Sequence, residues 1–205
     1  MKILIIDYGL GNLASVKRAV EECHGDPLVS ADPADIAQAS HLILPGVGSF
    51  ADGMKLLRER GWCDSLRQSV GGEGIPLLGI CLGMQLLADR GDEGGECDGL
   101  GLIPGRVERL AAAGPEERIP HVGWNEVRLV RPSPLFEGIA DGTDFYFVHS
   151  YALRPKDDSV IIGTTPYAEG FVSAVQSGCV FGVQFHPEKS VPAGFALLRN
   201  FLLTI

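Results

Sequence analysis

A cysteine flanked by glycines is the side chain in this sequence best placed for nucleophilic chemistry. Cys81 lies in the segment 79–83 (Gly-Ile-Cys-Leu-Gly), which follows the apolar run Ile75 to Leu78 and leads into apolar residues at helical spacing. This pattern predicts a strand, a sharp turn and a helix, with the nucleophile on the turn. The helix N-terminus would favour a thiolate, and the N–H of Leu82 is a candidate donor to an oxyanion. A buried structural cysteine at an ordinary strand-to-helix junction would show the same short pattern. Whether Cys81 is a nucleophile therefore depends on finding a base and an orienting group elsewhere in the sequence.

A histidine and a glutamate near the C-terminus supply those partners. His186 ends an apolar run, and Pro187 forces the chain out of the ladder. If the chain stays extended, Glu188 points to the same side as His186, and its carboxylate can fix the imidazole tautomer. Alone, this segment could be a strand end with a solvated acid. Together with Cys81 it predicts a nucleophile, a base and an orienting group, which is the machinery of acyl transfer.

The predicted elements bring a second loop to the same edge of a sheet. Up to residue 81, strand-like runs near residues 2–7, 27–29, 41–44 and 75–78 alternate with helical patterns. This order implies a parallel sheet with helices on both faces, and such sheets bind ligands beyond the carboxyl ends of their strands. The loop Pro45 to Gly48 lies at that edge, as does Cys81. The glycines of this loop can turn backbone amides toward an anion, although a strand-to-helix turn without a binding role would have a similar sequence.

The second half of the chain is rich in short strand-like runs. An acidic, glycine-rich segment, Gly91 to Gly99, is expected to be a surface loop, and Ala193 to Leu203 has the spacing of a packing helix. The strand-like runs between them are Arg106 to Leu110, Val122 to Val130, Phe145 to Tyr151, Val160 to Thr164, Phe171 to Gln176 and Val180 to Phe185. No linker or repeat separates the two halves, and a single domain over residues 1–205 is expected.

Composition excludes several classes of protein. The formal charge of −9 over 205 residues argues against nucleic acid or an anionic membrane as the main partner. The five cysteines form no Cys-x-x-Cys pair, which favours a reducing compartment over a disulfide scaffold or a zinc site. Neither a signal-peptide pattern nor an apolar stretch long enough for a bilayer is present, so a cytoplasmic protein without metal or cofactor is expected.

A glycine-rich turn near the N-terminus offers a different function. Gly9 and Gly11 follow the first strand, as in a dinucleotide-binding turn, but the third glycine of that motif is replaced by Ala14. Asn12 is instead expected to cap the helix that begins at Leu13.

The motifs together are specific enough to indicate a family. The segments 79–85 and 185–188 resemble those of the class I, or triad, glutamine amidotransferases. Further segments narrow the resemblance to the glutaminase subunits of imidazole glycerol phosphate synthase, a complex of histidine biosynthesis, and this resemblance covers essentially the whole chain. Those segments are 7–12, 45–50, 120–125 and 145–151.

This resemblance implies a fold and a reaction. The fold would be a flavodoxin-like α/β three-layer sandwich, with a mostly parallel central sheet and a smaller antiparallel sheet. Cys81 would attack the carboxamide of L-glutamine, His186 would transfer protons and Glu188 would hold His186, leaving a glutamyl thioester for water to hydrolyse. Val47, Gly48 and Leu82 would form the oxyanion hole. In the family, the loop before Ser49 can turn a carbonyl toward the site until the partner engages.

The resemblance also implies a substrate pocket and a partner. Ammonia would pass to a (β/α)₈-barrel synthase subunit, which makes imidazole glycerol phosphate and an aminoimidazole carboxamide ribonucleotide. The residues that would grip glutamine are Gly48, Gln85, Glu93, His149, Ser150 and Tyr151. The residues at or near the heterodimer interface would be Asn12, His121, Trp124, Asn125 and Lys189. From the residues alone, Trp124 could instead be a core side chain, and both histidines could be satisfied structural groups.

Three other functions share parts of this pattern. Another amidotransferase subunit, such as that of anthranilate synthase, would carry the same triad. A cysteine hydrolase of γ-glutamyl compounds would work without a partner. An inactive interaction module could retain the turn around Cys81 as scaffold, although the intact His186 and Glu188 argue against it.

Overall fold

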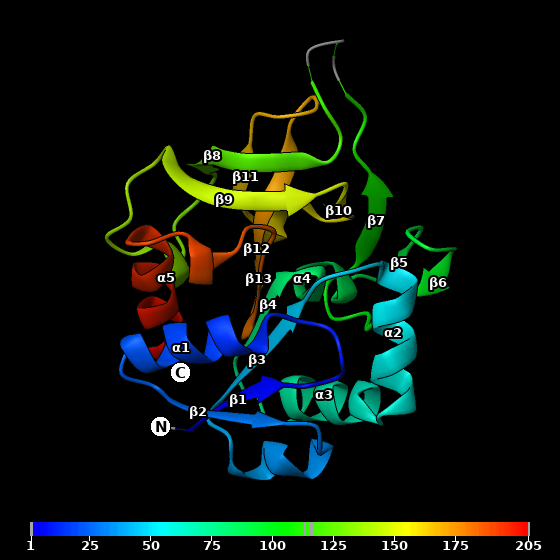
Figure 1. The fold of residues 1–205 in the computed structure, drawn as a ribbon, viewed down its shortest axis with the longest axis vertical. Coiled ribbons are helices and arrows are strands. Elements are labelled where there is room, and N and C mark those ends of the chain that lie inside the picture. The colour runs from blue at the N-terminus through cyan, green and yellow to red at the C-terminus, as the bar shows by residue number, and fades with distance from the viewer. Residues whose placement is uncertain (1, 113, 115–116, 205) are drawn as a thin grey trace.

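The computed structural model describes residues 2–112, 114 and 117–204. Within that part of the chain, a nine-stranded mixed sheet runs through the molecule in the order β2-β1-β3-β4-β13-β12-β11-β8-β9 (Figure 1). Pairing is parallel from β2 to β13 and antiparallel from β13 to β9. The strands are β1 (Lys2–Ile6), β2 (Asp26–Ser30), β3 (His41–Gly46), β4 (Leu77–Cys81), β8 (His121–Leu129), β9 (Thr143–His149), β11 (Ile161–Thr165), β12 (Phe171–Ser177) and β13 (Val180–Val183).

A second, four-stranded sheet lies beside the antiparallel half. Its order is β10-β7-β5-β6, and only the β5–β7 pair is parallel among its described pairs. Its strands are β10 (Tyr151–Pro155), β7 (Gly105–Arg109), β5 (Arg90–Gly91) and β6 (Cys97–Asp98).

Helices cover both faces of the parallel half. Helices α1 (Leu13–Glu22) and α5 (Ala193–Leu202) pack on one face, and α2 (Phe50–Glu59), α3 (Trp62–Gly71) and α4 (Leu82–Leu86) pack on the other (Figure 1). Side chains of β1 alternate between these layers: Ile3 and Ile5 join the core under α1 and α5, whereas Leu4 and Ile6 join the core under α2 and α3.

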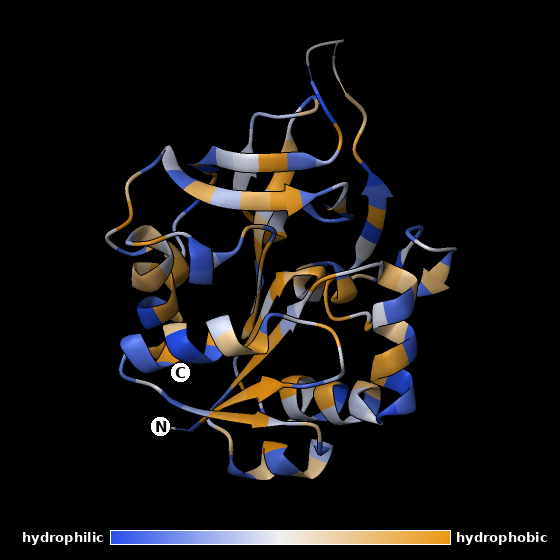
Figure 2. Ribbon diagram, viewed as in Figure 1, coloured by the Kyte–Doolittle hydropathy of each residue, from blue (hydrophilic) through white to orange (hydrophobic). Residues whose placement is uncertain are grey.

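The apolar residues are correspondingly concentrated in the inner strands (Figure 2). Both faces of these strands are buried, which explains why their sequences are almost continuously apolar and do not alternate with polar residues. The layers confirm the predicted α/β three-layer class. Short 3₁₀ helices complete the described elements, at Pro33–Gln38 (η1), Pro134–Phe136 (η2), Asp158–Val160 (η3) and Pro187–Lys189 (η4).

Two predicted segments differ from the structure. The predicted strand Phe145 to Tyr151 is divided, because the chain bends at Ser150 and passes from the large sheet into the small one. The predicted surface loop Gly91 to Gly99 begins with the second residue of β5 and contains β6. Gly91 is buried there, since a Cβ on it would lie 2.7 Å from the ring of Phe50.

The predicted cap of α1 is confirmed in its position but not in its hydrogen bond. Asn12 occupies the N-cap position, but its side chain makes no capping hydrogen bond. Asp32 does cap its short helix, accepting a hydrogen bond from the N–H of Ala34 at 2.9 Å. Across the described residues, none of the helices combines the length and apolar character needed to cross a membrane.

Candidate active site

The turn that carries Cys81 is strained, and its glycines are required by packing. Cys81 joins β4 to α4 with φ 55° and ψ −111°, a conformation that non-glycine residues rarely adopt. A Cβ on Gly79 would lie 2.6 Å from the carbonyl oxygen of Gly83, and a Cβ on Gly83 would collide with the carbonyl oxygen of Leu44. The turn therefore forms only with glycine on both sides of the cysteine, as the sequence predicts.

His186 and Glu188 form a buried pair. His186 Nδ1 lies 2.8 Å from Glu188 Oε1, and because a carboxylate only accepts, Nδ1 carries the proton. Burial alone would lower the pKa of His186, but Cys81 and Glu188 outweigh it and raise the pKa to about 10. His186 Nε2 has no hydrogen-bond partner among the described residues, so this nitrogen is available for proton transfer.

The turn after His186 is fixed to strand β9. The N–H of His186 donates to the carbonyl oxygen of Tyr146 at 2.9 Å. Ser190 Oγ donates to the carbonyl oxygen of His186 at 2.7 Å and accepts from the N–H of Tyr146 at 3.0 Å. These bonds hold the backbone of His186, and therefore its ring, in one position.

One cavity of about 490 Å³ brings the predicted site residues together. It contains every predicted catalytic, oxyanion and substrate residue except Glu188, which lies behind His186. Three further lining residues, Ser49, Pro120 and Val148, are not predicted by the sequence, although each adjoins a predicted position. The full lining is Val47, Gly48, Ser49, Cys81, Leu82, Gln85, Glu93, Pro120, Val148, His149, Ser150, Tyr151 and His186.

The loop Pro45 to Gly48 lies directly against the cysteine turn. A Cβ on Gly46 would lie 2.9 Å from Leu82 Cβ, so glycine is needed for this approach. Tyr8, which the sequence does not indicate, has its hydroxyl against the same point. That hydroxyl is buried without a hydrogen-bond partner among the described residues, and its pKa is raised by burial and by Cys81.

The far wall of the cavity carries groups that suit an amino acid. Glu93 is partly buried, and burial raises the pKa of its carboxyl against the opposing effect of a hydrogen bond from the Phe50 N–H. Gln85 is buried and uses its Nε2 twice, donating to the carbonyl oxygen of Tyr151 at 2.8 Å and to Gln184 Oε1 at 3.0 Å.

Two buried histidines connect this wall to strand β8. His149 Nδ1 lies 2.8 Å from the Tyr151 carbonyl oxygen, which only accepts, so His149 Nε2 must accept from His121 Nδ1 at 3.2 Å. Asn125 Nδ2 then donates to His121 Nε2 at 3.3 Å. Mainly through burial, the pKa values fall to about 4 for His121 and about 3 for His149. Both rings are therefore neutral and hydrogen-bonded at pH 7.

These pKa values predict a loss of stability in mild acid. The unfolded histidines bind protons near pH 6.5 and the folded ones do not, so the free energy of unfolding should fall as pH falls from 6.5 toward 4. Between pH 6.5 and 5 we expect a loss of about 1–2 kcal/mol for each ring. His186 contributes little here, because its raised pKa keeps it protonated in both states; its contribution is lost as pH rises from 6.5 to about 10.

Urea unfolding at several pH values measures this effect. The double variant His121→Phe/His149→Phe keeps the aromatic contacts with Tyr167 and Phe171 and should show a flatter slope between pH 5 and 6.5. An unchanged slope would mean that other groups cause the acid sensitivity.

Three of the five predicted interface residues, His121, Trp124 and Asn125, lie on the β8–β9 hairpin, but not all on its surface. Trp124 is 55% exposed and pairs with Tyr146, while Val122 is 57% exposed and pairs with Val148. Trp124 is therefore not a core residue. His121 lies on the opposite face and is 3% exposed, so it cannot itself contact a partner in this form.

Two further predicted interface residues lie near this hairpin. The Nζ of Lys189 is 5.3 Å from the ring centre of Tyr146, within cation–π range. Asn12 precedes α1, which packs against the η4 turn that contains Lys189. We call Val122, Trp124, Tyr146, Val148 and Lys189 the hairpin patch.

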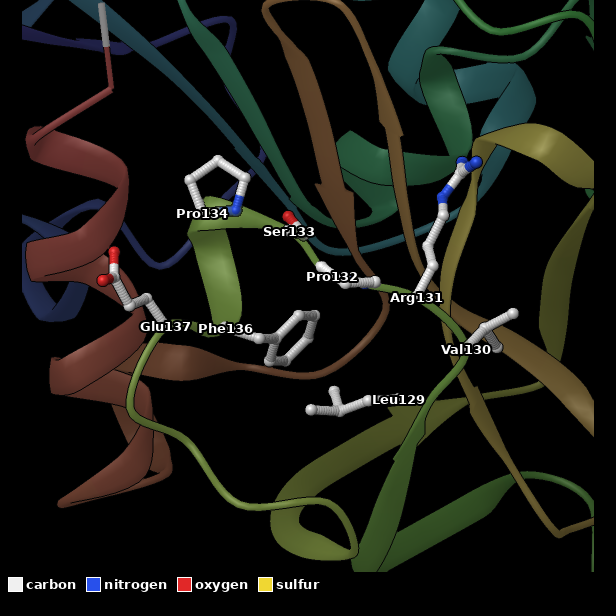
Figure 3. A pocket seen from close by; sticks show the side chains of 8 residues that line it. All are labelled: Leu129, Val130, Arg131, Pro132, Ser133, Pro134, Phe136 and Glu137. Atoms are coloured by element: carbon white, nitrogen blue, oxygen red, sulfur yellow. The ribbon is translucent and has the colours of Figure 1, made fainter.

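A larger hollow of about 730 Å³ lies elsewhere, between the end of β8 and η2 (Figure 3). Its charged side chains, Arg131 and Glu137, lie at opposite ends, with Phe136 and Leu129 between them. Neither a cysteine nor a histidine is among the described residues that line it. It therefore offers no counterpart to the chemistry of the Cys81 cavity.

Solved structures share this fold. A glutamine amidotransferase crystal structure aligns with a TM-score of 0.76 over 98% of this chain and 96% of its own, at 22% identity. The structure of PurLQS from Thermotoga maritima aligns with a TM-score of 0.77 over 98% and 97%, at 19% identity.

Comparison of the sequence identifies the family as well as the fold. The family model described as "Glutamine amidotransferase class-I" matches residues 4–205. The Moorella thermoacetica protein named imidazole glycerol phosphate synthase subunit HisH is 51% identical, covering 97% of this chain and 93% of its own. The Geobacillus kaustophilus protein of the same name is 48% identical, covering 97% and 94%. The chain therefore belongs to the class I glutamine amidotransferases and, within them, to the family of imidazole glycerol phosphate synthase HisH subunits.

Proposed function

We propose that this chain, acting as one domain over residues 1–205, is the glutaminase subunit of an imidazole glycerol phosphate synthase. It hydrolyses L-glutamine to glutamate and ammonia and delivers the ammonia to a (β/α)₈ synthase subunit in histidine biosynthesis. The observation that carries this proposal is the cavity that joins Cys81, His186 and the partly buried Glu93. A nucleophile, a base and a partner for an ammonium group are what a glutaminase needs.

The first half-reaction forms a thioester. Because Cys81 and Glu188 raise the pKa of His186, the proton of the Cys81 thiol passes to His186 Nε2 before attack, and the sulfur then attacks the Cδ carbonyl carbon of glutamine. The N–H groups of Leu82 and of Val47 or Gly48 stabilise the resulting oxyanion, and each such donor typically contributes about 3 kcal/mol. His186 then protonates the leaving nitrogen, the C–N bond breaks, and ammonia departs. Glu188 holds the His186 ring through Nδ1 during both proton transfers.

The second half-reaction restores the enzyme. His186 takes a proton from water, whose oxygen adds to the thioester carbonyl, and the C–S bond then breaks to release glutamate. Glutamine is held during both steps by Glu93 and by the wall formed from Gly48, Gln85, His149, Ser150 and Tyr151, which lines the cavity.

The hairpin patch is the proposed synthase interface. Apart from Lys189 it is made of apolar and aromatic residues, including the exposed Trp124, and tryptophan often dominates the binding energy of an interface. Val148 belongs both to the patch and to the cavity lining, so a partner bound there would adjoin the site where ammonia forms. Asn12, Asn125 and Lys189 would contribute polar contacts, with His121 supporting Asn125 from beneath.

Glutamate release from glutamine tests this function. The chain is assayed alone, with a cognate synthase subunit, and with that subunit plus its nucleotide ligand. We expect low activity alone and about a tenfold or larger increase with partner and ligand. Equal activity in all three assays would contradict the proposal and favour an independent hydrolase of γ-glutamyl compounds.

The same assay tests the interface. Trp124→Ala should raise the partner concentration needed for half-maximal stimulation by about 30-fold or more, without lowering the activity of the isolated chain. Leu203→Ala, which also removes an exposed apolar side chain but just beyond the end of α5, should have no effect. Equal behaviour of both variants would place the interface elsewhere.

A further inference from the structure

Gln184 is a buried polar residue that the mechanism above does not use. It is fully buried, just beyond the end of β13. Because Val183 pairs with Ile80 in parallel register, the next residue on each strand brings Gln184 opposite Cys81. Gln184 Nε2 lies 3.7 Å from Cys81 Sγ, within the range of a hydrogen bond to the large sulfur atom.

The direction of this contact follows from its neighbours. The Tyr151 carbonyl oxygen only accepts, so the Gln85 atom that faces it must be the amide nitrogen. The same nitrogen reaches Gln184, so the Gln184 atom facing it must be Oε1. The NH₂ group of Gln184 therefore faces the sulfur.

The other contacts of the sulfur complement this donor. The Val148 carbonyl oxygen, 3.9 Å from Sγ, can accept only from the protonated thiol. Gln184 can only donate to the sulfur, and a donor favours the charged form of an acid. With Cys81 only 6% exposed, little water remains to stabilise a thiolate, so a fixed donor has more effect than it would in solution.

We propose that Gln184 is a further catalytic residue of this site, which donates a side-chain N–H to the Cys81 sulfur and stabilises its thiolate form. When the thiol proton moves to His186 Nε2, the negative charge on the sulfur is met by the Gln184 amide on one side and the imidazolium on the other. The proposal rests on the proposed function, because it assigns Cys81 as the nucleophile.

Gln184→Met tests the proposal by removing the donor while approximating the shape of the side chain. The readout is the rate of Cys81 alkylation by iodoacetamide, measured against pH by mass spectrometry of the Cys81 peptide. We expect the pH midpoint to rise by about one unit and the rate at pH 7 to fall about tenfold. The other titratable groups beside Cys81, His186 and Tyr8, are unchanged in this variant.

Kinetics and a matched variant separate this role from simple packing. In the partner-stimulated assay kcat should fall about 10- to 100-fold with little change in KM, because Gln184 contacts the nucleophile and does not line the cavity. Ser173→Ala, a buried change on the neighbouring strand whose hydroxyl has no partner among the described residues, should leave the alkylation profile and kcat unaltered. Gln184→Glu, which keeps an acceptor for Gln85 but places an acid beside the sulfur, should raise the midpoint further.

An unchanged midpoint in folded Gln184→Met or Gln184→Glu overturns the proposal. If neither variant folds, the wild-type protein decides: the side-chain amide signals of Gln184 in ¹⁵N NMR should shift as Cys81 ionises and should stay constant in Cys81→Ala. Gln184 amide signals that do not shift when Cys81 ionises would also overturn the proposal. A wild-type chain that is readily alkylated but releases no glutamate would contradict the proposed function and leave the Gln184 contact intact.

Discussion

Replacing Cys81 with alanine should lower glutamate release by about 10⁴-fold or more, even with the synthase subunit and its ligand present. Among the described residues that line the cavity, Cys81 is the only one with a thiol, and a thioester needs that sulfur. Glutamine should still bind, because the carboxyl of Glu93 and the wall around Tyr151 are untouched. A coupled glutamate assay and calorimetric titration of glutamine measure the two effects separately.

Another free cysteine provides the control. Cys97 lies in β6, is not part of the cavity lining and forms no disulfide. Cys97→Ala should retain normal activity, while Cys81→Ala should form no thioester under single-turnover conditions. Substantial activity in Cys81→Ala, or its loss in Cys97→Ala alone, would refute the assignment of the nucleophile.

Gly83→Ala should destabilise the protein by about 4 kcal/mol or more, or prevent its folding. The added Cβ would collide with the backbone carbonyl oxygen of Leu44, and β3 cannot move away because it is paired with β1 and β4. Any relaxation would separate β3 from the cysteine turn and displace the loop that follows it, so activity should be lost as well.

A second glycine gives the matched comparison. A Cβ on Gly71, the last residue of α3, would meet no atom within 4 Å. Gly71→Ala should therefore be neutral or stabilise the protein by about 0.5–1 kcal/mol. Urea unfolding of both variants measures the difference, and a Gly83→Ala variant within about 1 kcal/mol of wild type would show that the turn tolerates a side chain.

The arrangement of the candidate site was predictable because its signals are local. Cys81 lies on a strained turn, and the backbone approaches so closely at positions 79 and 83 that only glycine fits there. The two glycines are therefore visible in the sequence as part of the motif. His186 and Glu188 are two residues apart, so their contact depends on a single turn of chain. Alternating strand and helix patterns then place the loop at Gly48 at the same edge of the sheet.

Features that depend on which strand or helix a residue packs against were not predictable from the sequence. The strand through Phe145 to Tyr151 looks continuous, but the chain bends at Ser150 because Tyr151 pairs with Arg109 of a different sheet. Trp124 and His121 lie on one strand and differ in burial, since only the packing of the β8–β9 hairpin decides which of its faces is covered.

Gln184 shows the same limit within the active site. It lies two residues before His186, a spacing that could have indicated the same side of a strand, but nothing local distinguishes it from an ordinary core-edge residue. The sequence by itself determined the fold class, the family and the residue types able to do the chemistry, because strained turns and short-range pairs require particular residues. Tertiary structure alone decided that Gln184 meets the sulfur, that Tyr8 lies beneath the loop and that His121 is buried, because strand register and long-range packing bring those partners together.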